Sequence, residues 1–457
     1  MTRRRSPFAL ALAGSLALAF ALSFSPPARG YETITHAGLT ERAALASTLH
    51  RVLIDKLGRP LGLYERLKLA PGDAELRQRL NRLDPEGGFV PDASGMQTAL
   101  AWLTAGAALE GVPAHRTRNH FLDPARGAGL FDDASSALRT RINDVVTGIG
   151  TVRGLFTGAS FDGTGLASPA WAIAQRAVND WGLARFLDER ERSAAAASRE
   201  ERDDALAKSL LAAGALAHLV EDAGDPAMVR NDFRVALEAD GARYDRFVAE
   251  RYGRVALPDA SAPPLDVKHL AELFRDGQGH GLAERTQRRF FSDGTLPSAG
   301  AYAFPEAQPG ARAAGYVAGD GVQHLAAFRR TRDGVEWTLD DRCHADYAAA
   351  LLPEVAGYAA ATLELLFRGR LDLEEKDGAL HVTAGDFALG AGTLAIYGEL
   401  PEGTRKQIFS RPVEKAAASG ELASLPRPAG ARRAAAVFRG FDAAGEPIVI
   451  VQELLLH

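Results

Sequence analysis

The chain has little cysteine, little lysine and only one long apolar run. Cys343 is the sole cysteine among 457 residues, so no intramolecular disulfide can form. A chain of this length does not need one, because it can bury a large hydrophobic core. The formal net charge of −5 at pH 7 gives no sign of the basic surface that non-specific nucleic-acid or membrane binding favours.

The apolar run lies at the N-terminus. Arg3–Arg5 precede apolar residues from Phe8 to Phe24, and small residues follow up to Gly30. This pattern predicts a secretory signal peptide cut between Gly30 and Tyr31, and therefore an exported protein, periplasmic or secreted. An uncleaved membrane anchor is the alternative. Cleavage would take the formal charge from −5 to −9, which further disfavours binding to nucleic acid.

Helical periodicity dominates the chain from residue 31 to about residue 370. Several segments repeat apolar residues at three- and four-residue spacing, and many are rich in alanine, a strong helix former. We therefore predict a bundle of helices in this region. The predicted helices are Thr40–Lys56, Ser94–Leu109, Ser135–Ile149, Ala170–Leu187, Asp203–Val220 and Asp346–Phe367.

The pattern changes after Gly369 and Arg370. Short apolar or alternating stretches bounded by Gly, Pro and Asp are typical of strands, so we predict a small β-sandwich over residues 371–457. The fold class is then mainly α, with residues 31–370 forming the helical domain. The predicted strands are Ala379–Val382, Gly392–Tyr397, Arg432–Phe438 and Pro447–Leu456.

The clearest chemical motif is His218-Leu-Val-Glu-Asp222 at the end of a predicted helix. Residues four apart lie on one helical face, so His218 and Asp222 can offer an imidazole nitrogen and a carboxylate oxygen to one metal or to two neighbouring metals. Taken alone, the motif is weak and more typical of a surface ion pair one turn apart.

Two further segments carry candidate ligands. His120 opens His-Phe-Leu-Asp-Pro124, where the proline prevents a helix from continuing. Cleavage after Gly30 would give Tyr31 a free α-amino group beside its carbonyl, a pair that can chelate a metal, with His36 five residues on. A surface histidine and a frayed terminus are the simpler interpretations of these segments.

In this order, the three motifs resemble those of the zinc-dependent phospholipases C and the related single-strand-specific fungal nucleases. The resemblance covers about Tyr31 to Arg370 and implies a two-zinc site, in which Asp222 bridges the metals. In the family, the N-terminal residue that binds zinc is usually Trp, where this chain has Tyr. The zinc ligands that the resemblance implies are Tyr31, His36, His120, His218 and Asp222.

The chain departs from the family pattern at a second group of positions. Before the His-Phe motif the family has Glu-Asp, whose Asp binds zinc, but this chain has Glu110-Gly111, so Glu110 becomes the candidate general base. Met228 stands where the family has a histidine, and a thioether is a poor zinc ligand. A family His-x-x-x-Glu is here Gly241 and Asp245, which leaves Asp245 as a weak ligand and predicts loss of the third zinc.

The resemblance therefore implies a zinc-dependent phosphodiesterase, most simply a phospholipase C-like enzyme that hydrolyses a phospholipid or another phosphodiester with a water activated by two zincs. By analogy, the C-terminal domain would contact a membrane surface. A catalytically degenerate binding protein on the same fold is the first alternative. A zinc-dependent nuclease is the second, although the chain shows no basic stripe with interleaved aromatic residues.

Overall fold

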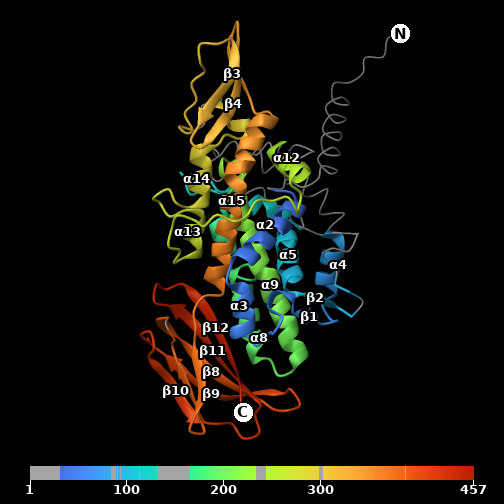
Figure 1. The fold of residues 1–457 in the computed structure, drawn as a ribbon, viewed down its shortest axis with the longest axis vertical. Helices are drawn as coiled ribbons and strands as arrows, with labels where there is room; N and C mark the ends of the chain where they lie inside the picture. Colours follow the sequence, from blue (N-terminus) through green and yellow to red (C-terminus); the bar gives the residue numbers. More distant parts are fainter. Residues whose placement is uncertain are drawn as a thin grey trace, which may run out of the picture.

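The computed structural model describes residues 31–83, 89, 91–92, 94–112, 114–130, 165–232, 243–297, 302–385 and 387–456. The predicted signal peptide, the predicted helix Ser135–Ile149 and Gly241 lie outside these residues. The described chain is a helical bundle followed by sheets of antiparallel strands, which confirms the predicted fold class (Figure 1). The helices are α2 (Thr33–Ala46), α3 (Leu49–Asp55), α4 (Ala74–Leu83), α5 (Ala99–Glu110), α7 (Ser168–Ala172), α8 (Leu183–Ala195), α9 (Arg199–Asp222), α10 (Pro226–Val229), α12 (Arg243–Arg251), α13 (Leu270–Phe274), α14 (Leu282–Arg289) and α15 (Asp341–Leu366).

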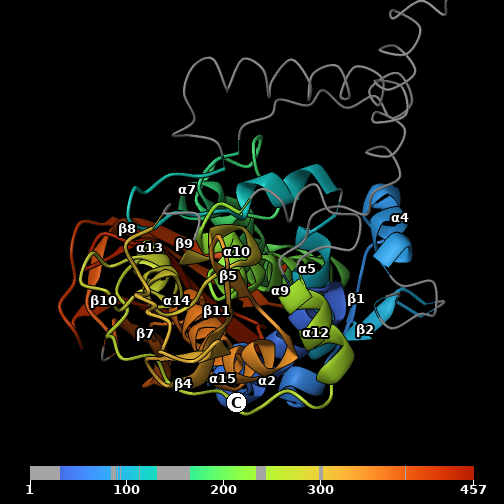
Figure 2. The same ribbon diagram turned by 90° about the horizontal axis from the view of Figure 1, so that it is seen from above.

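Helix α9 runs through the middle of the bundle, between α2, α5, α8 and α15 (Figure 2). It begins with a capping box, in which Ser198 accepts from the backbone of Glu201 and the Glu201 side chain accepts in return. Nearly every residue from Arg202 onward is buried, including the alanines that cover its faces. Between Ala205 and Val220 the helix carries apolar residues on every face, interrupted by Lys208 and His218, which is typical of a helix enclosed by neighbours.

The closest helix crossing joins α9 to α5. A Cβ atom added to Gly106 would lie 2.0 Å from the carbonyl oxygen of Leu211, and one added to Gly214 would lie 2.0 Å from that of Leu103. The two helices therefore meet backbone to backbone, and glycine is required on both sides of the contact.

Helix α15 is the other long helix of the bundle. By length and composition, it is the one helix among the described residues that could cross a membrane, but 67% of its apolar window is buried inside the protein. That burial is what a core helix of a folded domain requires.

Two predicted helices are wrong. The predicted helix Thr40–Lys56 is divided, because α2 ends at Ala46 and α3 begins at Leu49, after the extended backbone of Ser47. Over Ala170–Leu187 the chain forms α7, then a loop, and then α8. The Asn179 side chain donates to the carbonyl of Trp171 (3.0 Å) and accepts from the backbone of Trp181 (3.0 Å). These side chain–backbone bonds replace helical ones, as asparagine side chains do in turns.

A three-stranded antiparallel sheet between α14 and α15 was not predicted. It projects from one end of the molecule and packs on the first turns of α15, where the Tyr347 hydroxyl donates to the carbonyl of Leu325 (2.7 Å) (Figure 1). Its strands are β3 (Ala314–Gly319), β4 (Val322–Thr331) and β5 (Gly334–Thr338), and a two-stranded ladder elsewhere joins β1 (Arg66–Lys68) to β2 (Met96–Thr98).

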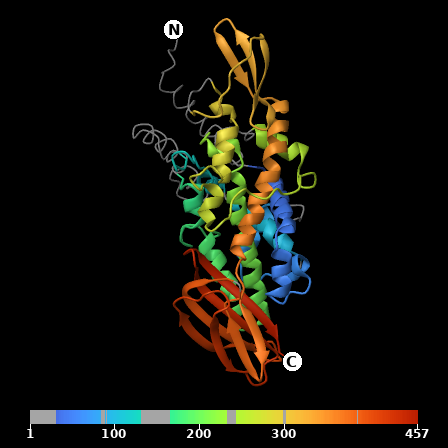
Figure 3. The ribbon, with the colours of Figure 1, turned by 60° about the vertical axis from the view of Figure 1, so that its left-hand side comes forward.

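The C-terminal strands form two sheets that enclose their own apolar core (Figure 3). The three-stranded sheet has the order β10-β7-β6 and the four-stranded sheet the order β12-β11-β8-β9. The structure adds β6, β9 and β10 to the strands expected from the sequence. The bounds are β6 (Asp372–Lys376), β7 (Ala379–Thr383), β8 (Leu389–Glu399), β9 (Arg405–Val413), β10 (Glu421–Pro426), β11 (Arg433–Asp442) and β12 (Pro447–Leu455).

Strand β11, inside the four-stranded sheet, is buried on both faces over most of its length. Along β11, Ala436 and Phe438 point into the sandwich core, whereas Ala435 and Val437 join the core of the helical bundle. This double burial explains why the strand is apolar at successive positions rather than alternating. Ion pairs at the start of α9, such as Arg202 to Glu399 (2.9 Å), complete the contact between the two parts.

Candidate metal centre

The last turn of α9 supplies two members of a buried histidine–carboxylate cluster. His218 Nε2 lies 3.1 Å from Asp222 Oδ2, because residues four apart share a face of the helix. His218 Nδ1 lies 2.7 Å from the carbonyl oxygen of Ala107 on α5. That oxygen can only accept, so Nδ1 carries the proton and Nε2 keeps its lone pair directed at Asp222.

Helix α2 brings His36 to the other oxygen of the same carboxylate. His36 Nε2 lies 3.3 Å from Asp222 Oδ1, and the imidazole stacks on that of His218 with ring centroids 3.6 Å apart. On the far side, His36 Nδ1 lies 2.6 Å from Glu221 Oε2, and Glu221 Oε1 accepts from Thr40 (2.7 Å). His36 therefore stands between two carboxylates of α9.

His120 completes the cluster from the segment that follows a short 3-10 helix, Ala114–Asn119. Its Nδ1 lies 2.6 Å from Asp222 Oδ2 and 3.2 Å from His218 Nε2. Its Nε2 points the other way, 3.6 Å from Glu110 Oε1. The structure thus brings together four of the residues singled out from the sequence, namely His36, His120, His218 and Asp222.

The donor atoms of this cluster fit a metal site. His36, His218 and Asp222 offer ligand atoms within 4.8 Å of one another. His36 Nε2 and Asp222 Oδ1 are buried and have no hydrogen-bond partner. Orphaned buried donors and acceptors are rare in folded proteins, and imidazole with carboxylate is the ligand set that zinc takes. The residues present are therefore of the kinds that ligate zinc.

Glu110 lies beside the cluster with both oxygens occupied. Oε1 accepts from Trp171 Nε1 (2.7 Å) and Oε2 accepts from Arg116 (2.6 Å). Burial would raise the pKa of Glu110, but Arg116 and His120 outweigh it and lower the pKa to about 2. A carboxylate held in this way is a weak proton acceptor. These contacts argue against the free general base expected from the sequence.

Tyr31 lies at the edge of the cluster. Its ring meets that of His36 edge to face, with centroids 5.9 Å apart, and its hydroxyl donates to the carbonyl of Gly224 (3.1 Å). The side chain is fully buried, so the chain is anchored at the residue where the predicted cleavage falls.

The positions of the third family site contain no histidine among the described residues. Met228 is buried against Phe121 and Leu130. Asp245 is also buried, and neither of its oxygens has a hydrogen-bond partner. Burial, followed by the charges of Asp225 and Asp222, raises the pKa of Asp245 well above its ordinary value. An apolar cluster and the neighbouring carboxyls of Asp245 and Asp225 thus occupy this part of the fold.

Gly111 leaves space at the cluster. An added Cβ would meet nothing closer than His218 Cε1, at 4.0 Å. A void of about 10 Å³ adjoins it, which is roughly one water-sized probe. The lining comprises Tyr31, Thr33, His36, Ala108, Gly111, Thr117, His120 and His218.

Charge within the cluster is distributed unequally. Burial tends to lower the pKa of His36, but Asp222 and Glu221 outweigh it and raise that pKa to about 9. Burial, with the charge of His36, lowers the pKa of His218 to about 4. Burial would raise the pKa of Asp222, but the surrounding histidines hold it well below its ordinary value. The metal-free cluster is therefore an ionised carboxylate shared among imidazoles.

Sequence reasoning missed Glu221 although it lies inside the His218–Asp222 motif. It precedes Asp222, so helical geometry turns it about 100° away from the helix face that carries His218 and Asp222. Its partner His36 lies 185 residues earlier in the chain. Only the packing of α2 on α9 brings the two together.

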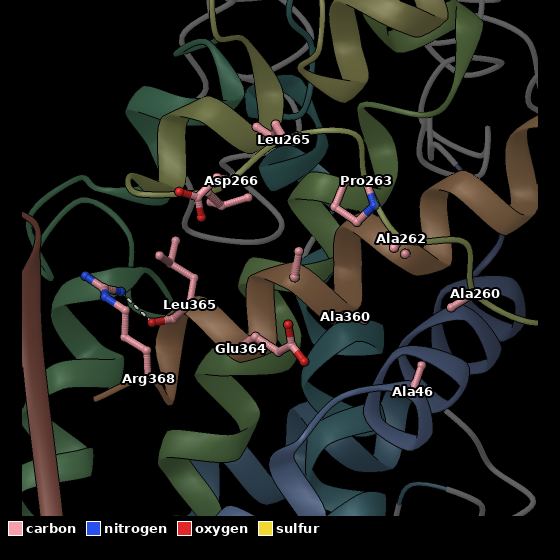
Figure 4. A pocket seen from close by; sticks show the side chains of 13 residues that line it. Ala46, Ala260, Ala262, Pro263, Leu265, Asp266, Ala360, Glu364, Leu365 and Arg368 are labelled. Carbon is pink, nitrogen blue, oxygen red and sulfur yellow. Dashed lines mark hydrogen bonds between the residues drawn. The ribbon is translucent and has the colours of Figure 1, made fainter. Parts of the chain in front are cut away.

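A larger groove of about 490 Å³ lies elsewhere, along α15, and contains none of the cluster residues (Figure 4). It is lined mostly by small apolar side chains such as Ala260, Ala360 and Ala361, with Asp266 and Glu364 on its walls. Its lining residues do not form a set of convergent ligands, so the groove does not indicate a binding function.

No family model and no curated protein matches the chain. Among solved structures it is similar to an alpha-toxin from Clostridium absonum, with 11% identity, coverage of 93% of this chain and 94% of that chain, and a TM-score of 0.28. It is also similar to the Clostridium perfringens alpha-toxin from avian strain SWCP, with 9% identity, coverage of 91% and 89%, and a TM-score of 0.24. Similarity at this level shows nothing about the function of this chain.

Proposed function

We propose that the protein is an exported, zinc-dependent phosphodiesterase that binds two zinc ions at the histidine–carboxylate cluster. The observation that carries the proposal is that the two carboxylate oxygens of Asp222 face different histidines. Its Oδ1 faces His36 Nε2 (3.3 Å), whereas its Oδ2 faces His120 Nδ1 (2.6 Å) and His218 Nε2 (3.1 Å). A carboxylate that presents each oxygen to a different set of imidazoles is suited to two neighbouring metals.

Zinc held there would supply Lewis-acid chemistry, polarising a phosphoryl oxygen and making a water more acidic. The chain itself would keep the ligands in place and exclude bulk water, since His36, His120 and Asp222 are at most 1% exposed. Tyr31 would add its amine and carbonyl on one side after cleavage at Gly30. Asp245 is the weakest candidate ligand, because it lies with Asp225 outside the histidine set.

The substrate class that this chemistry favours is a phosphodiester, of which a phospholipid is the first choice and nucleic acid the second. The position of the C-terminal sheets bears on how a lipid would be approached. They contact α9 near Arg202, twenty residues before Asp222, which corresponds to about 30 Å along the helix. A membrane surface could therefore contact both the sheets and the end of α9 that carries the cluster only if it lay along the side of the molecule.

A non-catalytic, metal-binding role is the second candidate. It is favoured by one observation, the occupation of both oxygens of Glu110 by Arg116 and Trp171. Such a protein would bind zinc and hydrolyse nothing.

The test is the zinc content of the chain beginning at Tyr31, measured for the wild type and for a His218→Ala/Asp222→Ala double variant. We expect about two zincs per chain and their loss in the variant, with hydrolysis of a p-nitrophenyl phosphodiester by the wild type alone. Glu189→Gln, on the buried face of α8, is the control that should change neither quantity. Two zincs without hydrolysis of a lipid, nucleotide or nitrophenyl diester would support the second candidate. No zinc under zinc-replete conditions would overturn both.

A further inference from the structure

The three histidines of the cluster share one arrangement. Each has one ring nitrogen near Asp222 and the other near an oxygen atom of the protein. For His218 that oxygen is the carbonyl of Ala107, for His36 it is Glu221 Oε2, and for His120 it is Glu110 Oε1, at 2.7, 2.6 and 3.6 Å. At hydrogen-bond distance, as for His218 and His36, the outer oxygen decides which nitrogen carries the proton and which keeps its lone pair. Glu110 Oε1 acts on His120 Nε2 by its charge, since that nitrogen has no hydrogen-bond partner.

We infer that Glu221 and Glu110 are positioning residues that hold His36 and His120 as ligands, each for a different one of the two proposed metal ions. The inference rests on the proposed function and refines it. Glu221 acts on the side of Asp222 Oδ1, because His36 is the histidine that faces that oxygen. Glu110 acts on the side of Asp222 Oδ2, which His120 faces.

Both glutamates are themselves fixed by neighbours. Glu221 is fully buried and accepts from Thr40 through its second oxygen (2.7 Å). Glu110 is fully buried and is held by Trp171 and by Arg116, whose guanidinium stacks on the Trp171 ring at 5.1 Å. An orienting carboxylate must itself be immobile to define the ring it holds, and these contacts provide that rigidity.

The inference explains a feature of the sequence. With Gly111 in place of a side chain that could reach the metals, Glu110 one position earlier points at the outer nitrogen of His120 instead. It therefore supports a ligand rather than replacing one. Glu221 does the same for His36 from the adjacent position to Asp222.

The test is a titration of the metal-free chain beginning at Tyr31 with Co²⁺ and with Zn²⁺, following visible absorption and heat, for Glu221→Ala, Glu110→Gln and the wild type. Glu110→Gln is used because it keeps the shape of the side chain and one acceptor oxygen, so that either Arg116 or Trp171 keeps its partner. We expect each variant to lose about tenfold or more in affinity for one ion and to keep the affinity of the other. Glu221→Gln, which retains an acceptor for His36, should fall between the wild type and Glu221→Ala.

Glu189→Gln is the matched control, since Glu189 is a buried glutamate paired with Arg185 (2.9 Å) on α8, away from the cluster. It should leave both affinities unchanged. Equal weakening of both ions in each variant would show a general loosening of the fold and overturn the inference. If both variants instead bind both ions with wild-type affinity, the inference is overturned while the proposed function stands. A wild type that binds no metal would remove the proposed function and the inference together.

Discussion

Replacing Gly106 by alanine sets two opposing effects against each other. Alanine favours a helix by ~1 kcal/mol relative to glycine, which alone would stabilise α5. The added Cβ, however, would lie 2.0 Å from the carbonyl oxygen of Leu211, so α5 and α9 would have to separate by more than 1 Å. Overpacking of this kind costs ~1–3 kcal/mol, and a backbone atom cannot move aside as a side chain can.

We therefore expect Gly106→Ala to destabilise the fold by up to ~2 kcal/mol, the overpacking cost less the helix gain, which is a fall in Tm of up to roughly 3 °C for a domain of this size. It should also weaken metal binding, because Ala107 is the next residue and its carbonyl orients His218. Far-UV circular dichroism during urea and thermal unfolding measures the first effect, and a zinc titration measures the second.

Two further variants make this result decisive. Gly214→Ala places a Cβ at 2.0 Å from the carbonyl of Leu103 and should behave in the same way from the α9 side. Gly72→Ala meets nothing within 4 Å and should change stability by less than ~0.5 kcal/mol. If both helix variants are as stable as the wild type, the two backbones are not in contact and the account of the crossing is wrong.

Other expectations follow from single side chains. Gly111→Asp should tighten metal binding, measured by zinc titration, because the space at the cluster admits a further carboxylate there. Burial raises the pKa of Cys343 to about 12, so its thiol should stay unreactive to an aromatic disulfide reagent at pH 8 until the protein unfolds. Burial lowers the pKa of His344 to about 4. The unfolded chain therefore takes up this proton first as pH falls from 6.5, and up to ~3 kcal/mol of stability should be lost between pH 6.5 and 4. His344→Phe should flatten that part of the urea-denaturation profile.

The sequence predicted the part of the fold that depends on local periodicity. The long apolar repeat of α9 marks a buried helix, and the four-residue spacing of His218 and Asp222 fixes their common face. The strands β8, β11 and β12 were found because they are apolar at successive positions. Each of these signals is contained in a short window of sequence.

Features set by tertiary contacts were not predictable in the same way. Strand β9 is charged and mostly exposed, so it lacks an apolar pattern. The turn that ends α7 depends on Asn179 bonding back to Trp171. The role of Glu110 depends on Arg116 and Trp171, which lie 6 and 61 residues away and occupy its oxygens only in the folded chain.

Asp245 gives the sharpest test of the predicted loss of a third metal site. Its two oxygens have no hydrogen-bond partner, and its pKa is raised well above the ordinary value, first by burial and then by Asp225 and Asp222. Because the raised pKa belongs to the folded state, the unfolded chain holds fewer protons above pH 4, and folding loses stability as pH rises. Asp245→Asn keeps the shape and removes the charge, so it should stabilise the metal-free protein at pH 7, by ~1 kcal/mol or more.

The gain should shrink towards pH 4, where Asp245 is protonated in the unfolded chain as well. Asp204→Asn is the matched control: Asp204 is equally buried, but it accepts from Ala70 (2.9 Å) and Lys208 (3.0 Å), so its replacement should destabilise. Urea denaturation at pH 7 and pH 4.5 measures both. If Asp245→Asn instead destabilises the protein and lowers its zinc content, Asp245 is a metal ligand, because only a bound cation would make that buried charge favourable.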